Sequence, residues 1–168
     1  MIMWEKAEFI INIVLTIISA VGAYNSIRYF KKSKHITLYA QSNKALGELG
    51  EMIRILPDVL FMATASTGKK GFSLQNAISE KGTELANHLN VIMDAIPSAY
   101  SAEFRALQRT EGFDLEQYIN SFIDKTVLIT EDGVFTLDRS VFDTCQVRLR
   151  EMQEFLKLKI AEEEEKLK

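Results

Sequence analysis

The chain has 168 residues, of which 47% are hydrophobic and 26% charged, and its net charge of −3 gives a pI near 5.5. This length is near the usual size of one domain. Basic and acidic residues are interspersed, so the chain lacks the basic face that nucleic acid requires, and we expect no nucleic-acid partner. The single cysteine excludes an intramolecular disulfide and a zinc site built from cysteines.

An uncharged run of 19 residues extends from Phe9 to Ile27. As a helix it would be about 28 Å long, close to the roughly 30 Å hydrocarbon core, with a mean hydropathy of roughly 1.8. Trp4, Tyr24 and Tyr29 flank it, as is typical near headgroups. We therefore predict a transmembrane helix. The alternatives are a signal peptide, which would need a positive leading segment, and a buried core helix, which would keep a polar stripe.

Charges beside the span predict its orientation. Only Lys6 precedes it, and the basic side chains that follow it are Arg28, Lys31, Lys32 and Lys34. The positive-inside rule places the N-terminus outside and the C-terminal domain in the cytoplasm, with these basic residues near anionic headgroups. We therefore divide the chain into a tail, transmembrane helix and basic flank at residues 1–34 and a cytoplasmic helical domain at residues 35–168.

One face of the predicted span carries small and polar side chains. At alternating spacings of four and three lie Asn12, Thr16, Ser19, Ala23 and Ser26. Such residues let helices pack closely in lipid, and a carboxamide in hydrocarbon is costly unless it hydrogen-bonds to another helix. The alternative is that the hydroxyls bond their own backbone. We expect contact with lipid and packing on a second copy or on another membrane protein.

The stretch from Ile36 to Ala65 has a heptad-like apolar pattern. Its members are Tyr39, Ser42, Leu46, Leu49, Ile53, Leu56, Leu60 and Ala63. This pattern predicts one helix of an intramolecular bundle, with a parallel coiled coil as the alternative. Pro57 is expected to kink or divide the helix.

Further helices are predicted in turn after residues 66–71, which form a turn without a complete phosphate-binding motif. Ser73 can cap a helix that ends near Ile96 with an apolar face, and a shorter helix spans about residues 99–109. Gly112 and Asp114 mark a turn and a cap before a helix over residues 115–124. The fold class is therefore mainly α, a bundle of about four helices after the transmembrane helix.

The dipeptide Asp132-Gly133 lies between two β-branched or apolar runs, so residues 126–137 predict a short β-hairpin, the only strand signal in the chain. Asp138 or Ser140 should start the last helix. Its inward face is predicted to comprise Val141, Cys145, Leu149, Met152, Leu156 and Ile160. The ending AEEEEKLK is polar all round, so we expect a solvated, fraying helix with ion pairs four residues apart.

Residues that could carry chemistry are few. Glu80, Glu84 and His88 share a helix face, but the spacing lacks a second motif for a metal pair and is typical of a solvated surface. Cys145 is expected to be a buried small hydrophobe, and His35 to lie at the membrane interface. We expect no catalytic residue, cofactor or metal.

The sequence favours a non-enzymatic, single-pass membrane scaffold or accessory subunit that associates through its transmembrane helix. The alternative is an oligomerising membrane effector of toxin or phage-defence type, which perturbs the bilayer when its cytosolic domain is triggered. Both hypotheses require a span that associates with other helices.

Overall fold

The protein is mainly helical. A computed structural model describes residues 2–66, 72–124 and 138–167, with side chains described from Asn12 in the first helix and from Asn76 in the second. Within these ranges the elements, in chain order, are α1 (Ile2–Ser66), α2 (Phe72–Ala95), α3 (Ser101–Gln108), β1 (Arg109–Thr110), β2 (Phe113–Asp114), α4 (Leu115–Asp124) and α5 (Arg139–Leu167). The predicted turn at 66–71 and the hairpin at 126–137 fall largely or wholly outside the described residues.

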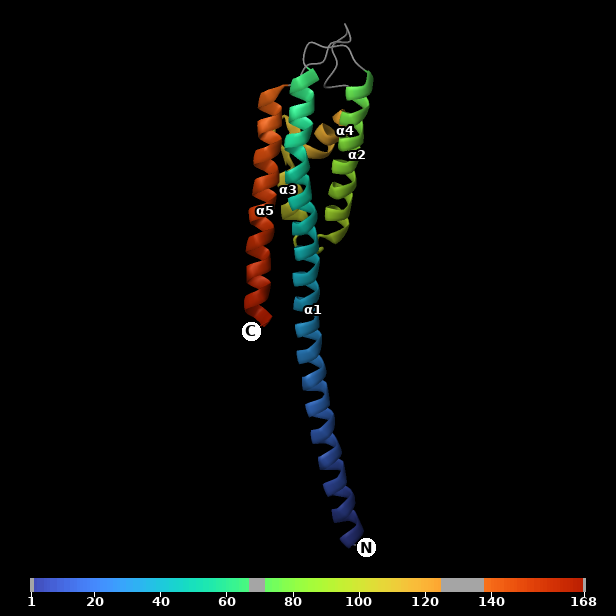
Figure 1. Ribbon diagram of the computed structural model, residues 1–168. Coiled ribbons are helices and arrows are strands. Elements are labelled where there is room, and N and C mark those ends of the chain that lie inside the picture. Colours follow the sequence, from blue (N-terminus) through green and yellow to red (C-terminus); the bar gives the residue numbers. More distant parts are fainter. Residues whose placement is uncertain (1, 67–71, 125–137, 168) are drawn as a thin grey trace.

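Helix α1 is a single helix of 65 residues, about 98 Å long at 1.5 Å per residue. Its N-terminal half projects away from the other helices, and its C-terminal half lies among them (Figure 1). The predicted division at Pro57 is wrong, because α1 continues through this proline. A proline inside a helix costs about 3 kcal/mol. Burial of Leu56 and Val59 on either side of it, at about 1.5–3 kcal/mol each, offsets that cost.

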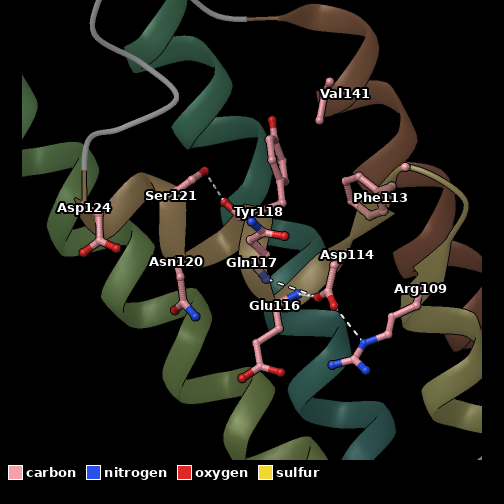
Figure 2. Close-up of a pocket in the computed structure, with 11 residues that line it drawn as sticks. Arg109, Phe113, Asp114, Glu116, Gln117, Tyr118, Asn120, Ser121, Asp124 and Val141 are labelled. Carbon is pink, nitrogen blue, oxygen red and sulfur yellow. Dashed lines mark hydrogen bonds and ion pairs between the residues drawn. The ribbon is translucent and has the colours of Figure 1, made fainter.

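A short antiparallel hairpin, which the sequence patterns did not predict, joins α3 to α4. Arg109 pairs with Asp114 and Thr110 with Phe113. Gly112, at a φ of 82°, supplies the left-handed residue of the predicted turn. The Asp114 Oδ1 atom accepts hydrogen bonds from the backbone N–H groups of Glu116 (3.0 Å) and Gln117 (3.2 Å), which confirms the predicted cap of α4 (Figure 2).

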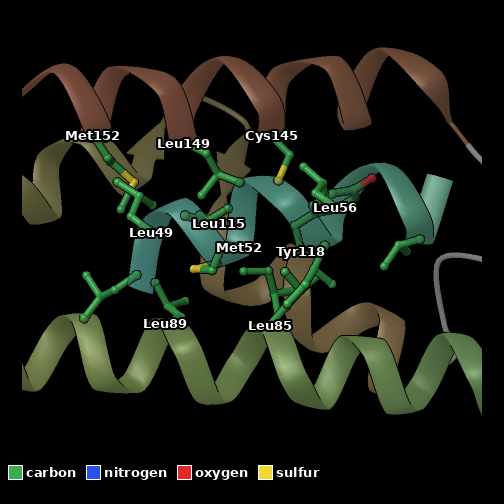
Figure 3. Close-up of a cluster of buried hydrophobic side chains, with 14 of the residues drawn as sticks. Leu49, Met52, Leu56, Leu85, Leu89, Leu115, Tyr118, Cys145, Leu149 and Met152 are labelled. Carbon is green, nitrogen blue, oxygen red and sulfur yellow. The ribbon is translucent and has the colours of Figure 1, made fainter. Parts of the chain in front are cut away.

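The core forms around the C-terminal half of α1, which packs between α2 and α5 (Figures 1 and 3). Four members of the predicted heptad pattern are buried: Ser42, Leu49, Leu56 and Ala63. The heptad pattern omitted a second buried row on α1, which comprises Ala45, Met52, Ile55 and Val59. The buried surface is wider than a heptad seam because α1 has a neighbouring helix on two sides.

Helices α2 and α4 approach closely at Gly82. An added Cβ atom at this position would lie 2.8 Å from Phe122 Cβ and 3.2 Å from the backbone nitrogen of Ile123. Ser79, one turn earlier in α2, donates a hydrogen bond to the Ile123 carbonyl over 3.2 Å. The absence of a side chain at Gly82 therefore sets the distance between these helices.

Helix α5 begins after Asp138, whose Oδ1 accepts hydrogen bonds from the Ser140 N–H (2.9 Å) and the Val141 N–H (3.5 Å). This confirms Asp138 as the cap. The predicted inward face is buried at Cys145, Leu149, Met152 and Leu156, and Val141 and Ile160 are half-buried. Phe142 is also fully buried.

Candidate functional site

The exposed part of α1 is the most unusual surface of the described chain. Among the described helices, α1 alone is long and apolar enough to cross a membrane; its best 18-residue window has a mean hydropathy of 1.3 and is 0% buried. Ile18 is 61% exposed, and Tyr29 and Phe30 are each 73% exposed. Burial elsewhere in the fold therefore does not explain why this segment is apolar.

The predicted packing residues share this exposed segment. Asn12, Thr16, Ser19, Ala23 and Ser26 all lie in α1 and are all exposed. The Thr16 hydroxyl donates a hydrogen bond to the Asn12 carbonyl over 2.7 Å, so it bonds its own backbone, as the alternative reading of this face anticipated.

The predicted basic flank follows directly on the same helix. Arg28, Lys31, Lys32 and Lys34 are exposed, and none of them has an ion-pair partner among the described side chains. Beyond them, α1 first meets the rest of the fold at His35, which is half-buried. Contact with the bundle therefore begins one residue after the basic flank.

At this junction lies a buried carboxylate, although the polar ending AEEEEKLK predicted that it would face solvent. Glu163, near the end of α5, is only 1% exposed. Its Oε2 atom lies 2.6 Å from His35 Nδ1, and its Oε1 atom accepts hydrogen bonds from the Tyr100 hydroxyl (2.7 Å) and Lys166 Nζ (2.6 Å). Burial by itself would raise the pKa of Glu163, but these hydrogen bonds outweigh it and lower the pKa to about 2.

These contacts bear on three predictions. The end of α5 is not polar all round and solvated, because Glu163 points inward and is buried. Of the pairs expected four residues apart, Glu162 with Lys166 is replaced by pairs three apart, between Lys159 and Glu162 and between Glu163 and Lys166. The pair expected between Glu164 and Lys168 includes a residue outside the described ranges. His35 contacts Glu163 of α5, and its expected position at the membrane interface stays a prediction. A sequence signal existed, since position 163 continues the inward spacing of Leu149, Leu156 and Ile160.

The remaining candidate residues do not form a catalytic arrangement. His88 contacts Glu48 of α1 over 2.7 Å, while Glu84 pairs with Lys81 over 2.6 Å. Cys145 is fully buried as predicted, and burial raises its pKa to about 12, which makes it a poor nucleophile at neutral pH. Across the described ranges, no group of His, Cys, Asp and Glu side chains is arranged to hold a metal ion.

An open depression of about 590 Å³ lies beside the hairpin and the start of α4 (Figure 2). Two of its charged side chains are already engaged, since Arg109 Nε lies 2.7 Å from Asp114 Oδ2 and the same carboxylate caps α4. The depression contains neither histidine nor cysteine. It therefore reflects the local architecture of the cap.

No protein-family model, curated protein or solved structure matches this chain. The fold and the exposed segment together define a mainly helical protein with one candidate membrane-spanning helix.

Proposed function

We propose that this protein is a non-enzymatic, single-pass membrane scaffold or accessory subunit. Residues 1–34 hold it in the bilayer with the N-terminus outside, and residues 35–168 form the cytoplasmic domain. The observation that carries the proposal is the exposure of apolar side chains such as Ile17 and Ile18, which are 57% and 61% exposed. A contiguous apolar surface of this kind is unfavourable in water, and a bilayer would cover it.

The orientation of the small and polar face supports a partner in the membrane. Positions 29 residues apart in an α-helix are separated by about eight turns and lie on the same face. Thr16, Ser19, Ala23 and Ser26 therefore share a face with Ala45, Glu48, Met52 and Ile55, respectively. Ala45, Met52 and Ile55 are fully buried, and Glu48 contacts His88 of α2.

The small and polar face of the span is thus the continuation of the face of α1 on which α2 packs; Met52 lies between these two helices (Figure 3). A second copy of α1 lying nearly parallel against that face would collide with α2, which already covers the same face in the C-terminal half of α1. A helix of another polypeptide that ends at the membrane surface would meet no such obstacle. This geometry favours a different membrane protein over a second copy as the partner at Ser19.

The alternative function, an oligomerising membrane effector, requires copies of the span to meet. Given the position of α2, they would meet on another face, such as the one that carries Val14 and Val21. Over-expression separates the two functions: loss of membrane potential that Val21→Trp, on this second face, abolishes would favour the effector, and a normal potential favours the scaffold.

Alkaline carbonate extraction of membranes tests the anchor with the full chain. We expect the wild-type protein to stay in the membrane pellet and the double variant Ile17→Lys, Ile18→Lys to be extracted, because each lysine costs about 3 kcal/mol at the centre of a span. Phe61→Lys is the matched control, since Phe61 is 75% exposed but lies outside the span. Extraction of the wild-type chain would refute the anchor.

Disulfide cross-linking tests the partner. In membranes, Ser19→Cys should give no dimer of this chain, because α2 blocks a parallel second copy. Val21→Cys, which faces the other side of the helix, reports any association through that face. A Ser19→Cys dimer formed at the expected mass of two copies would contradict the assignment of a different partner.

A further inference from the structure

The last three turns of α5 are held to the rest of the fold in an unusual way. After Leu156, the only described residue of α5 that is fully buried is Glu163. Leu158 is 58% exposed and Ile160 is only half-buried, so apolar packing contributes less here than in the part of α5 up to Leu156. The segment from Lys157 to Leu167 therefore depends on a polar contact where the rest of α5 depends on apolar burial.

This contact joins three elements of the fold. His35 belongs to α1, Tyr100 precedes α3, and Glu163 and Lys166 belong to α5. Lys159 covers the cluster from one side, with its Nζ atom 5.5 Å from the centre of the Tyr100 ring. Hydrogen bonds to a charged group are roughly twice as strong as those between neutral groups, so the carboxylate dominates the attachment of the segment.

The interface between α1 and α5 next to this cluster includes one group whose burial is unfavourable. Counting seven residues along each of the two antiparallel helices from the His35–Glu163 pair leads to Ser42 and Leu156, both of them fully buried. The Ser42 hydroxyl has no hydrogen-bond partner within the described parts of the chain. A buried hydroxyl without a partner favours opening of the interface that buries it, because water would satisfy the group.

We propose that residues 157–167 form a releasable latch, which Glu163 holds against the membrane-proximal turns of α1. When the latch is closed, it covers one face of α1 between His35 and Ser42 and fixes the end of α5 to α1. When it opens, these turns and Tyr100 become accessible while the apolar core stays folded. The latch is thus a local unfolding unit that can transmit an event at the exposed half of α1 to the bundle.

The latch does not depend on the membrane anchor, because none of its contacts involves a residue of the span or of the basic flank. Hydrogen exchange of the full chain in detergent micelles tests it. Glu163→Gln keeps the shape of the side chain but removes its charge, and it should raise the exchange rates of amides in 157–167 about tenfold or more. Amides in the core part of α1, from Leu49 to Ala63, should keep their wild-type protection.

Glu165→Gln is the matched control, because it makes the same change two residues away on an exposed side chain. Tyr100→Phe removes one donor from the opposite side of the cluster and should raise exchange in the same segment. A second readout is alkylation of Ser42→Cys, which Glu163→Gln should accelerate and Glu165→Gln should not. Equal exchange in the wild type, Glu163→Gln and Tyr100→Phe would overturn the latch, as would loss of protection throughout the core.

Discussion

Replacing Gly82 by alanine is expected to destabilise the bundle, although alanine is normally the better helix residue. In an exposed helix the change would gain about 1 kcal/mol. At Gly82 the new methyl group would lie 2.8 Å from Phe122 Cβ and 3.2 Å from both the backbone nitrogen and Cγ1 of Ile123. Because one of these atoms belongs to the backbone, α4 must move away from α2 to make room.

The magnitude follows from the two opposing effects. Overpacking a core costs about 1–3 kcal/mol, which exceeds the gain in helix propensity. We therefore expect a net loss of about 1 kcal/mol for Gly82→Ala. Gly47 and Gly50 provide the matched controls, since an added Cβ atom at either position meets no atom within 4 Å. Gly47→Ala should gain about 0.5–1 kcal/mol, so the two variants should differ by about 2 kcal/mol.

Denaturant unfolding of the full chain in detergent, followed by far-UV circular dichroism, measures this difference. The Gly82→Ala midpoint should fall below that of the wild type, and the Gly47→Ala midpoint should rise above it. If Gly82→Ala were as stable as Gly47→Ala, the close approach of α2 to α4 at this position would be refuted.

Three further predictions concern single side chains. Asp114→Ala removes the cap of α4 and should cost about 1 kcal/mol in denaturant unfolding, whereas Glu116→Ala, in the first turn of α4, should cost less. Cys145 should resist alkylation at pH 8 in the folded protein and react fully in denaturant, because the thiol is buried and its pKa is raised to about 12. Glu163 should make the free energy of unfolding depend on pH. Folding lowers its pKa to about 2, so its contribution to stability is complete above pH 4.5 and is lost as the pH falls from there to about 2. Unfolding at pH 6 and pH 3 should therefore differ less for Glu163→Gln than for the wild type.

Much of the fold follows from patterns among residues that are close together in the sequence. The caps at Asp114 and Asp138 were predictable because a carboxylate before an apolar period bonds the free N–H groups of the next turn. Burial of Cys145 and Leu149 followed from their spacing along one face of α5. The mainly helical class was predictable for the same reason, since two prolines leave long stretches free to continue as helices.

The sequence misled where distant contacts outweigh local preference. Pro57 is a helix breaker by itself, yet buried neighbours keep α1 continuous through it. The two-residue strands around Gly112 carry no periodicity long enough to detect. Gly82 looks like a weak helix position and is in fact the point of contact with α4.

The sequence by itself determined the apolar run from Phe9 to Ile27, the four basic residues behind it and the small and polar face along it, because composition and spacing are local properties. Only the tertiary structure decided what these features adjoin. It made the run part of one unbroken helix, placed its small and polar face in line with the face that α2 covers, and buried Glu163 against His35. The physical reason is that a hydrogen bond between residues 128 positions apart leaves no periodic trace in the chain.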